Sequence, residues 1–124
     1  MNLVQEYLVL LNEVISFRET VSDSASAEIH NKKVNKMVAL AAEIEHNAPE
    51  LKKEFYDLLM NENADIRLWV AHHILELMTY ERECRRVAIK EIRRKIRADK
   101  SALGYGEKVW LKNWYQSHPG DRWL

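Results

Sequence analysis

Apolar residues recur every three or four positions along most of the chain, which is the spacing of one face of an α-helix. Polar stretches containing Ser, Asn, Asp, Pro or Gly interrupt this pattern at intervals, so the sequence predicts six helices. They are expected at residues 3–18, from a polar turn at 20–24 to residue 46, at 49–60, 65–79 and 81–97, and around 109–114 after Gly104 and Gly106. Short connections favour antiparallel neighbours. We therefore expect one all-helical domain over residues 1–124, built from three antiparallel hairpins.

The segment at residues 61–78 is the most informative part of this pattern. A polar, Asn-rich turn is followed by Ile66 and Arg67, and then by a helix whose apolar positions cover almost its whole circumference. Such a helix needs neighbours on every side, as the inner helix of a stacked pair has. We therefore expect Val70, Ile74 and Leu77 in the deepest core. The guanidinium of Arg67 is expected to hydrogen-bond to carbonyls or acids of the preceding turn.

This order of polar turn, Ile-Arg pair and apolar helix resembles the central part of a HEAT repeat. In such repeats the arginine braces the turn between adjacent repeats. The resemblance implies a HEAT/ARM-like, right-handed stack of the three hairpins. An irregular helical bundle is the alternative architecture.

The composition agrees with a helical fold and bounds the class of protein. Only three of the 124 residues are Gly and two are Pro, so few residues interrupt helices. The single cysteine, Cys84, excludes an internal disulfide and fits a reducing compartment. The first residues lack the pattern of a signal peptide, and no apolar run approaches the roughly 18 residues of a membrane span. We expect a soluble, cytoplasmic domain.

Charge is distributed unevenly, although the formal net charge is zero. Residues 1–65 carry a net charge of −6 and residues 66–124 a net charge of +6. The basic half contains a segment at 82–97 with eight Lys or Arg residues and two acids, so nucleic-acid binding through helix 82–97 is an alternative function. Against it, Arg85, Lys90 and Lys95 spread around the helix, and no aromatic residues are interleaved with the cations. A solvated helix offset by the acidic half is the simpler interpretation.

The sequence offers few candidates for catalysis or metal binding. His72 and Glu76 lie four positions apart on one helix face, but the adjacent His73 points elsewhere, and a zinc site needs three or four converging ligands. Neighbouring arginines would lower the pKa of Cys84, yet this cysteine shares a stripe with Ala88, so we expect a small core residue. No catalytic-triad order or phosphate-binding glycine loop is present. We expect no enzymatic activity and no catalytic, cofactor-binding or metal-binding residues.

Aromatic residues gather near the end of the chain. Trp110 and Trp114 share a helix face and are expected to seal the last hairpin. Tyr115 and Trp123 lie off that face. Exposed aromatic residues are common anchors of interfaces, so these two are candidates for contact with a partner.

Several stretches together carry a resemblance to a known family. They are residues 30–36 (HNKKVNK), residues 65–71 (DIRLWVA), and residues 88–92 (AIKEI) followed by Gly-Tyr-Gly at 104–106 and by Trp114. This order resembles a family of small HEAT-like bacterial proteins with a domain of unknown function. Its members are often encoded beside secreted polymorphic toxins, including those of contact-dependent growth inhibition, and are thought to act as immunity proteins. The resemblance implies a protein that binds a cognate toxin domain and blocks it, and it supplies no catalytic residues.

One stripe on the predicted helix 65–79 is the candidate binding surface. It consists of Asp65, Trp69, His72 and Glu76 at positions i, i+4, i+7 and i+11, with Glu28 and Glu43 of the second helix expected to flank it. An indole bordered by carboxylates could anchor the basic cleft of a nuclease toxin, such as an RNase, and occlude its active site. The alternative is that Trp69 packs into a neighbouring helix. A generic protein-interaction adaptor without a toxin partner is a further alternative function.

Overall fold

The structure of the protein, a computed structural model, describes residues 1–17 and 24–124. Within these ranges the chain forms helices and connecting turns and no strand, so the predicted all-helical fold is confirmed. The α-helices are α1 (Leu3–Phe17), α2 (Ser24–Asn47), α3 (Lys52–Asp57), α4 (Ala64–Leu77), α5 (Arg82–Ala98) and α6 (Ala102–Ser117). Short 3₁₀ helices flank α3 at Pro49–Leu51 and Leu58–Met60, and a third follows α6 at Pro119–Asp121. None of the helices described is long and apolar enough to cross a membrane.

Most predicted helix bounds agree with the structure to within a few residues. The polar turn expected at 20–24 lies outside the described residues except for Ser24, which begins α2. The segment expected as one helix at 49–60 is helical throughout, but only its central part, α3, is α-helical. Pro49 stands at the start of this segment, where its missing N–H leaves no helical hydrogen bond unmade.

The start of α6 differs from the expectation drawn from its glycines. Gly104 and Gly106 predict a turn before the sixth helix, but α6 begins at Ala102 and includes both. The Ser101 hydroxyl caps the helix by accepting a hydrogen bond from the Leu103 N–H over 3.3 Å. Gly104 is buried, and a Cβ at this position would overlap the main-chain oxygen of Asp99. The glycine therefore permits a close approach between α6 and the end of α5.

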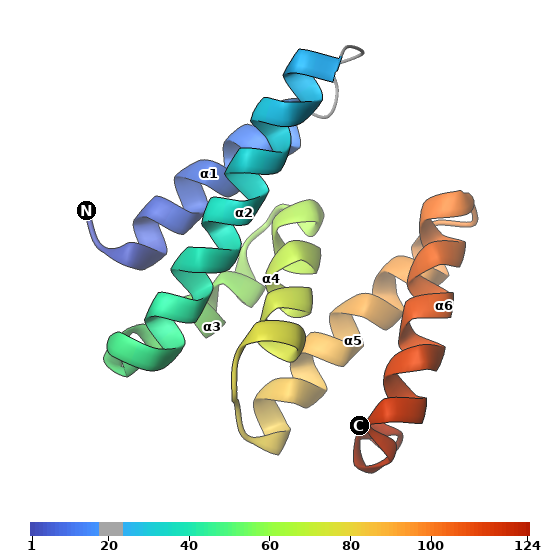
Figure 1. Ribbon diagram of the computed structural model, residues 1–124. Helices are drawn as coiled ribbons and strands as arrows, with labels where there is room; N and C mark the ends of the chain where they lie inside the picture. Colours follow the sequence, from blue (N-terminus) through green and yellow to red (C-terminus); the bar gives the residue numbers. More distant parts are fainter. Residues whose placement is uncertain (18–23) are drawn as a thin grey trace.

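The helices are arranged as a series of antiparallel neighbours (Figure 1). The first two, α1 and α2, run in opposite directions and pack along each other. In the second group, α4, α5 and α6 alternate in direction, and α5 contacts both α4 and α6. Because α4 also contacts α1, α2 and α3, it is the central helix of the molecule.

The hydrophobic core extends from α1 to α6 and includes most of α4. Val70 and Ile74 are fully buried, as predicted. Leu77 is only half-buried, so its assignment to the deepest core is wrong. It is the last residue of α4, and the following residue, Met78, occupies the buried position instead. The nearly continuous apolar surface of α4 is thus explained by helices on several of its sides.

Candidate functional site, a groove between α4 and α6

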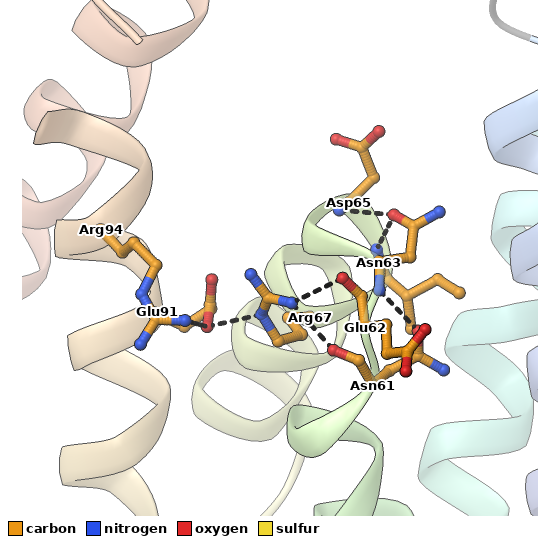
Figure 2. Close-up of polar contacts among 8 residues, drawn as sticks. Asn61, Glu62, Asn63, Asp65, Arg67, Glu91 and Arg94 are labelled. Atoms are coloured by element: carbon orange, nitrogen blue, oxygen red, sulfur yellow. Dashed lines mark hydrogen bonds and ion pairs between the residues drawn. The ribbon is translucent and has the colours of Figure 1, made fainter. Parts of the chain in front are cut away.

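The turn before α4 is held by a network of hydrogen bonds centred on Arg67 (Figure 2). Its Nη1 donates to the main-chain oxygens of Asn61 and Glu62, over 2.8 and 3.0 Å. Its Nε donates to Oε1 of Glu91 on α5 over 2.9 Å. The predicted role of Arg67 as a brace of this turn is confirmed. The same side chain also fixes the start of α4 against α5.

Asn63 completes this turn by capping α4. Its Oδ1 accepts hydrogen bonds from the main-chain N–H groups of Asp65 and Ile66, over 2.8 and 3.3 Å. An N-cap asparagine satisfies N–H groups that have no partner inside the helix. The cap and Arg67 together fix the start of α4, the helix that carries the exposed stripe.

The predicted stripe on α4 lines a groove with a volume of about 290 Å³. The lining residues are Asp65, Leu68, Trp69, His72, His73 and Glu76 from α4, Lys95 from α5, and Leu103 and Glu107 from α6. The structure thus brings the four predicted stripe residues together on one surface. It adds two neighbours from α6 that the sequence did not reveal.

Polar contacts join the two sides of the groove. His72 Nε2 lies 2.6 Å from Glu107 Oε2, and Glu76 Oε1 accepts a hydrogen bond from Trp110 Nε1 over 2.8 Å. The rings of His72 and Trp110 also meet edge to face, with their centroids 4.4 Å apart. These contacts fix α6 relative to α4, so the shape of the groove is set in advance of any binding.

Trp69 belongs both to the groove and to the edge of the core. It is half-buried, and its ring meets His73 edge to face at a centroid distance of 5.8 Å. Trp69 therefore also packs against the core, but its contact with His73 lies within α4, so packing of Trp69 into a neighbouring helix stays a prediction. The remainder of the indole faces the groove.

The groove is predominantly acidic. Among the residues described, three carboxylates line it, from Asp65, Glu76 and Glu107, and one ammonium group, from Lys95, opposes them. The Lys95 ammonium already pairs with Asp99 over 2.9 Å. Leu103 adds an apolar contribution, because 60% of its surface is exposed. The groove therefore combines negative charge with apolar surface.

Glu28 and Glu43 lie elsewhere on the molecule. Both are exposed on α2, where Glu28 pairs with Lys32 over 3.9 Å and Glu43 accepts a hydrogen bond from Asn47 over 3.0 Å. Neither residue is among those that line the groove. Leu103 and Glu107 of α6 flank the stripe instead.

The remaining chemical candidates are structural groups. His73 is buried beneath the groove, and this burial, reinforced by the neighbouring His72, lowers the pKa of its imidazole to about 4. Cys84 is half-buried, and burial together with Glu81 raises the pKa of its thiol, so the expected lowering by arginines is wrong. Within the part of the chain that the structure describes, no group of three or more His, Cys, Asp or Glu side chains is placed to hold a metal ion.

The arrangement can bind a cationic, partly apolar group. A Lys or Arg side chain has an apolar stem that can lie on Trp69 and Leu103 and a charged head that can reach the carboxylates. An indole face also attracts cations. No family model, curated protein or solved structure matches this chain.

Proposed function

We propose that this chain is a cytoplasmic immunity protein that binds a bacterial toxin domain and occludes its active site. The resemblance to small HEAT-like immunity proteins supports a toxin as the partner, and the acidic surface supports a nuclease, such as an RNase, as the class of toxin. The reducing cytoplasm suits a protein with a single cysteine, Cys84. The helices serve as a HEAT-like scaffold that presents the groove between α4 and α6.

One observation carries this proposal, namely the gathering of carboxylates and apolar side chains in a preformed groove. Nuclease clefts are basic because they bind phosphates. An acidic surface is attracted to such a cleft and speeds the encounter between the two proteins. The apolar surface of Trp69 and Leu103 then supplies affinity once water is excluded.

The size of the groove suggests how the partner engages it. A volume of about 290 Å³ accommodates one or two side chains rather than a whole segment of a partner. We expect one Lys or Arg of the toxin, drawn from its substrate-binding cleft, to enter the groove. Its stem would contact Trp69 and Leu103, and its charged head would approach Asp65 or Glu107. A side chain held in this way cannot bind phosphate, and the body of the immunity protein covers the rest of the cleft.

Growth protection tests the function directly. The C-terminal domain of a secreted protein encoded beside this gene is expressed in bacteria with and without this chain. Rescue of growth, together with a complex that co-purifies, is the expected result. If the neighbouring domain is toxic and this chain neither protects the cells nor binds the domain, the proposed function is wrong.

A further inference from the structure

A second groove lies along the exposed side of α5, and it is basic whereas the first groove is acidic. Four cations of α5, at positions i, i+4, i+7 and i+11, share one stripe along this groove, namely Arg86, Lys90, Arg93 and Arg97. At 1.5 Å per residue, the stripe is about 16 Å long. Arg122 and Trp123, which follow the last 3₁₀ helix, complete the lining. The groove has a volume of about 740 Å³.

Two other cations of α5 lie outside this stripe and make structural contacts. Arg85 pairs with the buried Asp121 over 3.0 Å, and Lys95 pairs with Asp99 over 2.9 Å. The cations of this helix therefore do not form one diffuse surface, as their spread in the sequence suggested. Arg85 and Lys95 stabilise the fold, whereas Arg86, Lys90 and Arg97 of the stripe are exposed.

The end of the chain is held firmly against this stripe. Arg93 donates hydrogen bonds to the main-chain oxygen of Leu124 and to the hydroxyl of Tyr115. The side chain of Leu124 is buried in the core, and Trp114 Nε1 donates to Asp121 over 3.1 Å. Trp123 stands between these anchored residues, yet 83% of its surface is exposed. The fold thus presents an indole beside a row of cations.

The groove carries a strong excess of positive charge. Among the residues described, Glu83 is the only acidic side chain that lines it, and its carboxylate lies 3.7 Å from Arg86. Within residues 1–17 and 24–124, no acidic side chain forms an ion pair with three cations of the groove, Lys90, Arg97 and Arg122. These cations are available to an anionic ligand.

We infer that this groove binds single-stranded nucleic acid. The cations of the stripe contact successive phosphates, and one base stacks on the exposed face of Trp123. Proteins that bind single strands without sequence preference combine these same two elements, a basic groove and a stacking aromatic side chain. A strand rises at least about 3.4 Å per nucleotide, so the stripe spans a few phosphates.

Two other occupants fit the groove less well. A DNA duplex is read by a helix that enters its major groove, whereas α5 is packed against both α4 and α6 and exposes only one side. An acidic protein segment would satisfy the cations. It does not, however, account for an indole exposed beside them, for which every base offers a flat stacking face.

The test measures binding of fluorescein-labelled oligo-dT and oligo-U to the full chain by fluorescence anisotropy at several salt concentrations. A duplex of mixed sequence and an oligo-glutamate peptide serve as competitors. Two test variants are used, Lys90→Gln with Arg97→Gln, and Trp123→Ala. The matched control is Lys108→Gln with Lys112→Gln, which removes two exposed lysines of α6 outside this groove.

The expected result is salt-dependent binding of the single strands. Removing two stripe charges should weaken binding at least about tenfold and reduce the slope of log K against log salt by about 1.4. Trp123→Ala should weaken binding about tenfold through lost stacking. The control variant should bind like the unmodified protein, and melting temperatures should be unchanged because the altered side chains are exposed.

Several outcomes would overturn the inference. The inference is wrong if neither single strand binds, or if the control variant weakens binding as much as the test variants do. It is also wrong if the duplex binds more tightly than the single strands. Competition by oligo-glutamate as strong as that by oligo-dT would assign the groove to an acidic protein partner instead. None of these outcomes depends on the toxin, so this groove and the α4–α6 groove are tested independently.

Discussion

The hydroxyl oxygen of Tyr7 lies 2.6 Å from Nδ1 of His73, and both side chains are buried. The contact joins α1 to α4 across the core, and the ring of Phe55 meets Tyr7 edge to face at 4.8 Å. Burial without an opposite charge disfavours the charged form of either group, so it raises the pKa of Tyr7 and lowers that of His73. In the neutral tautomer with its proton on Nε2, the His73 ring accepts the hydrogen bond of the Tyr7 hydroxyl. The stability of the fold is therefore linked to pH through this histidine.

We predict that His73 destabilises the protein in mild acid. Its pKa is about 4 in the folded protein and 6.5 ordinarily, so between these values the unfolded chain binds a proton that the folded chain does not. The free energy of unfolding therefore falls as the pH falls from about 6.5 to 4, by up to about 3 kcal/mol. Urea unfolding at a series of pH values measures this fall.

Two variants isolate the contribution of His73 from that of the carboxylates. His73→Gln keeps an acceptor for Tyr7 but cannot be protonated, so it should unfold with a flatter pH dependence between 6.5 and 4. His46→Gln, at an exposed position of α2, should keep the original dependence. Parallel pH profiles for the unmodified protein and His73→Gln would contradict the assignment.

Arg67→Ala should lower the free energy of unfolding by about 3–5 kcal/mol. The change removes three hydrogen bonds and leaves the buried Glu91 carboxylate without its principal partner. Arg94→Ala is the matched control, because Arg94 contacts the same carboxylate over 3.2 Å from an exposed position, and it should cost less than about 1 kcal/mol. If Arg67→Ala keeps full stability and loses partner binding, Arg67 belongs to the binding surface and is not a brace.

The two glycines of α6 should respond to alanine with opposite signs. Gly104→Ala forces a methyl group onto the Asp99 carbonyl and should destabilise the protein by about 1–3 kcal/mol. Gly106 has open space around it, so Gly106→Ala should stabilise the helix by about 0.5–1 kcal/mol. Thermal unfolding of both variants distinguishes these signs. Equal effects would mean that α6 does not approach α5 as closely as described.

Ile74 and Leu77 should differ although both are apolar residues of α4. Ile74→Ala removes a fully buried side chain and should cost about 2–5 kcal/mol. Leu77→Ala should cost clearly less, because this side chain is only half-buried at the end of the helix. Melting temperatures followed by far-UV circular dichroism provide the comparison, and a larger loss at Leu77 would contradict the burial of the two residues.

Local patterns explain how much of the structure could be predicted from the sequence. Helical spacing placed Val70 and Ile74 in the core, and the polar turn before Ile66 indicated the role of Arg67. The stripe containing Trp69 was found for the same reason, because residues i and i+4 share a helix face wherever that helix lies.

The partners of that stripe could not be found in this way. Leu103 and Glu107 reach the groove only because α6 packs across α5. The contact of Glu107 with His72 joins residues 35 positions apart in the chain. The first turn of α6 was also not predicted, because it contains glycine, which is an unfavourable helix residue. Ser101, a favourable N-cap residue, was the available signal. The position of Trp123 beside the cations of α5 also depends on packing between residues far apart in the sequence.

Binding kinetics of the domain that the growth-protection experiment identifies as the partner test the central claim, our proposal that the α4–α6 groove is the inhibitory surface. Stopped-flow association at two salt concentrations is measured for the unmodified protein, for Glu76→Lys and for Leu103→Ala. Exposed positions outside the groove supply matched controls, Glu50→Lys for charge and Ile29→Ala for apolar surface. We predict that Glu76→Lys slows association and flattens its salt dependence, that Leu103→Ala speeds dissociation, and that both controls behave like the unmodified protein. Association and dissociation rates that the groove variants leave unchanged, or that the controls alter equally, would contradict the account.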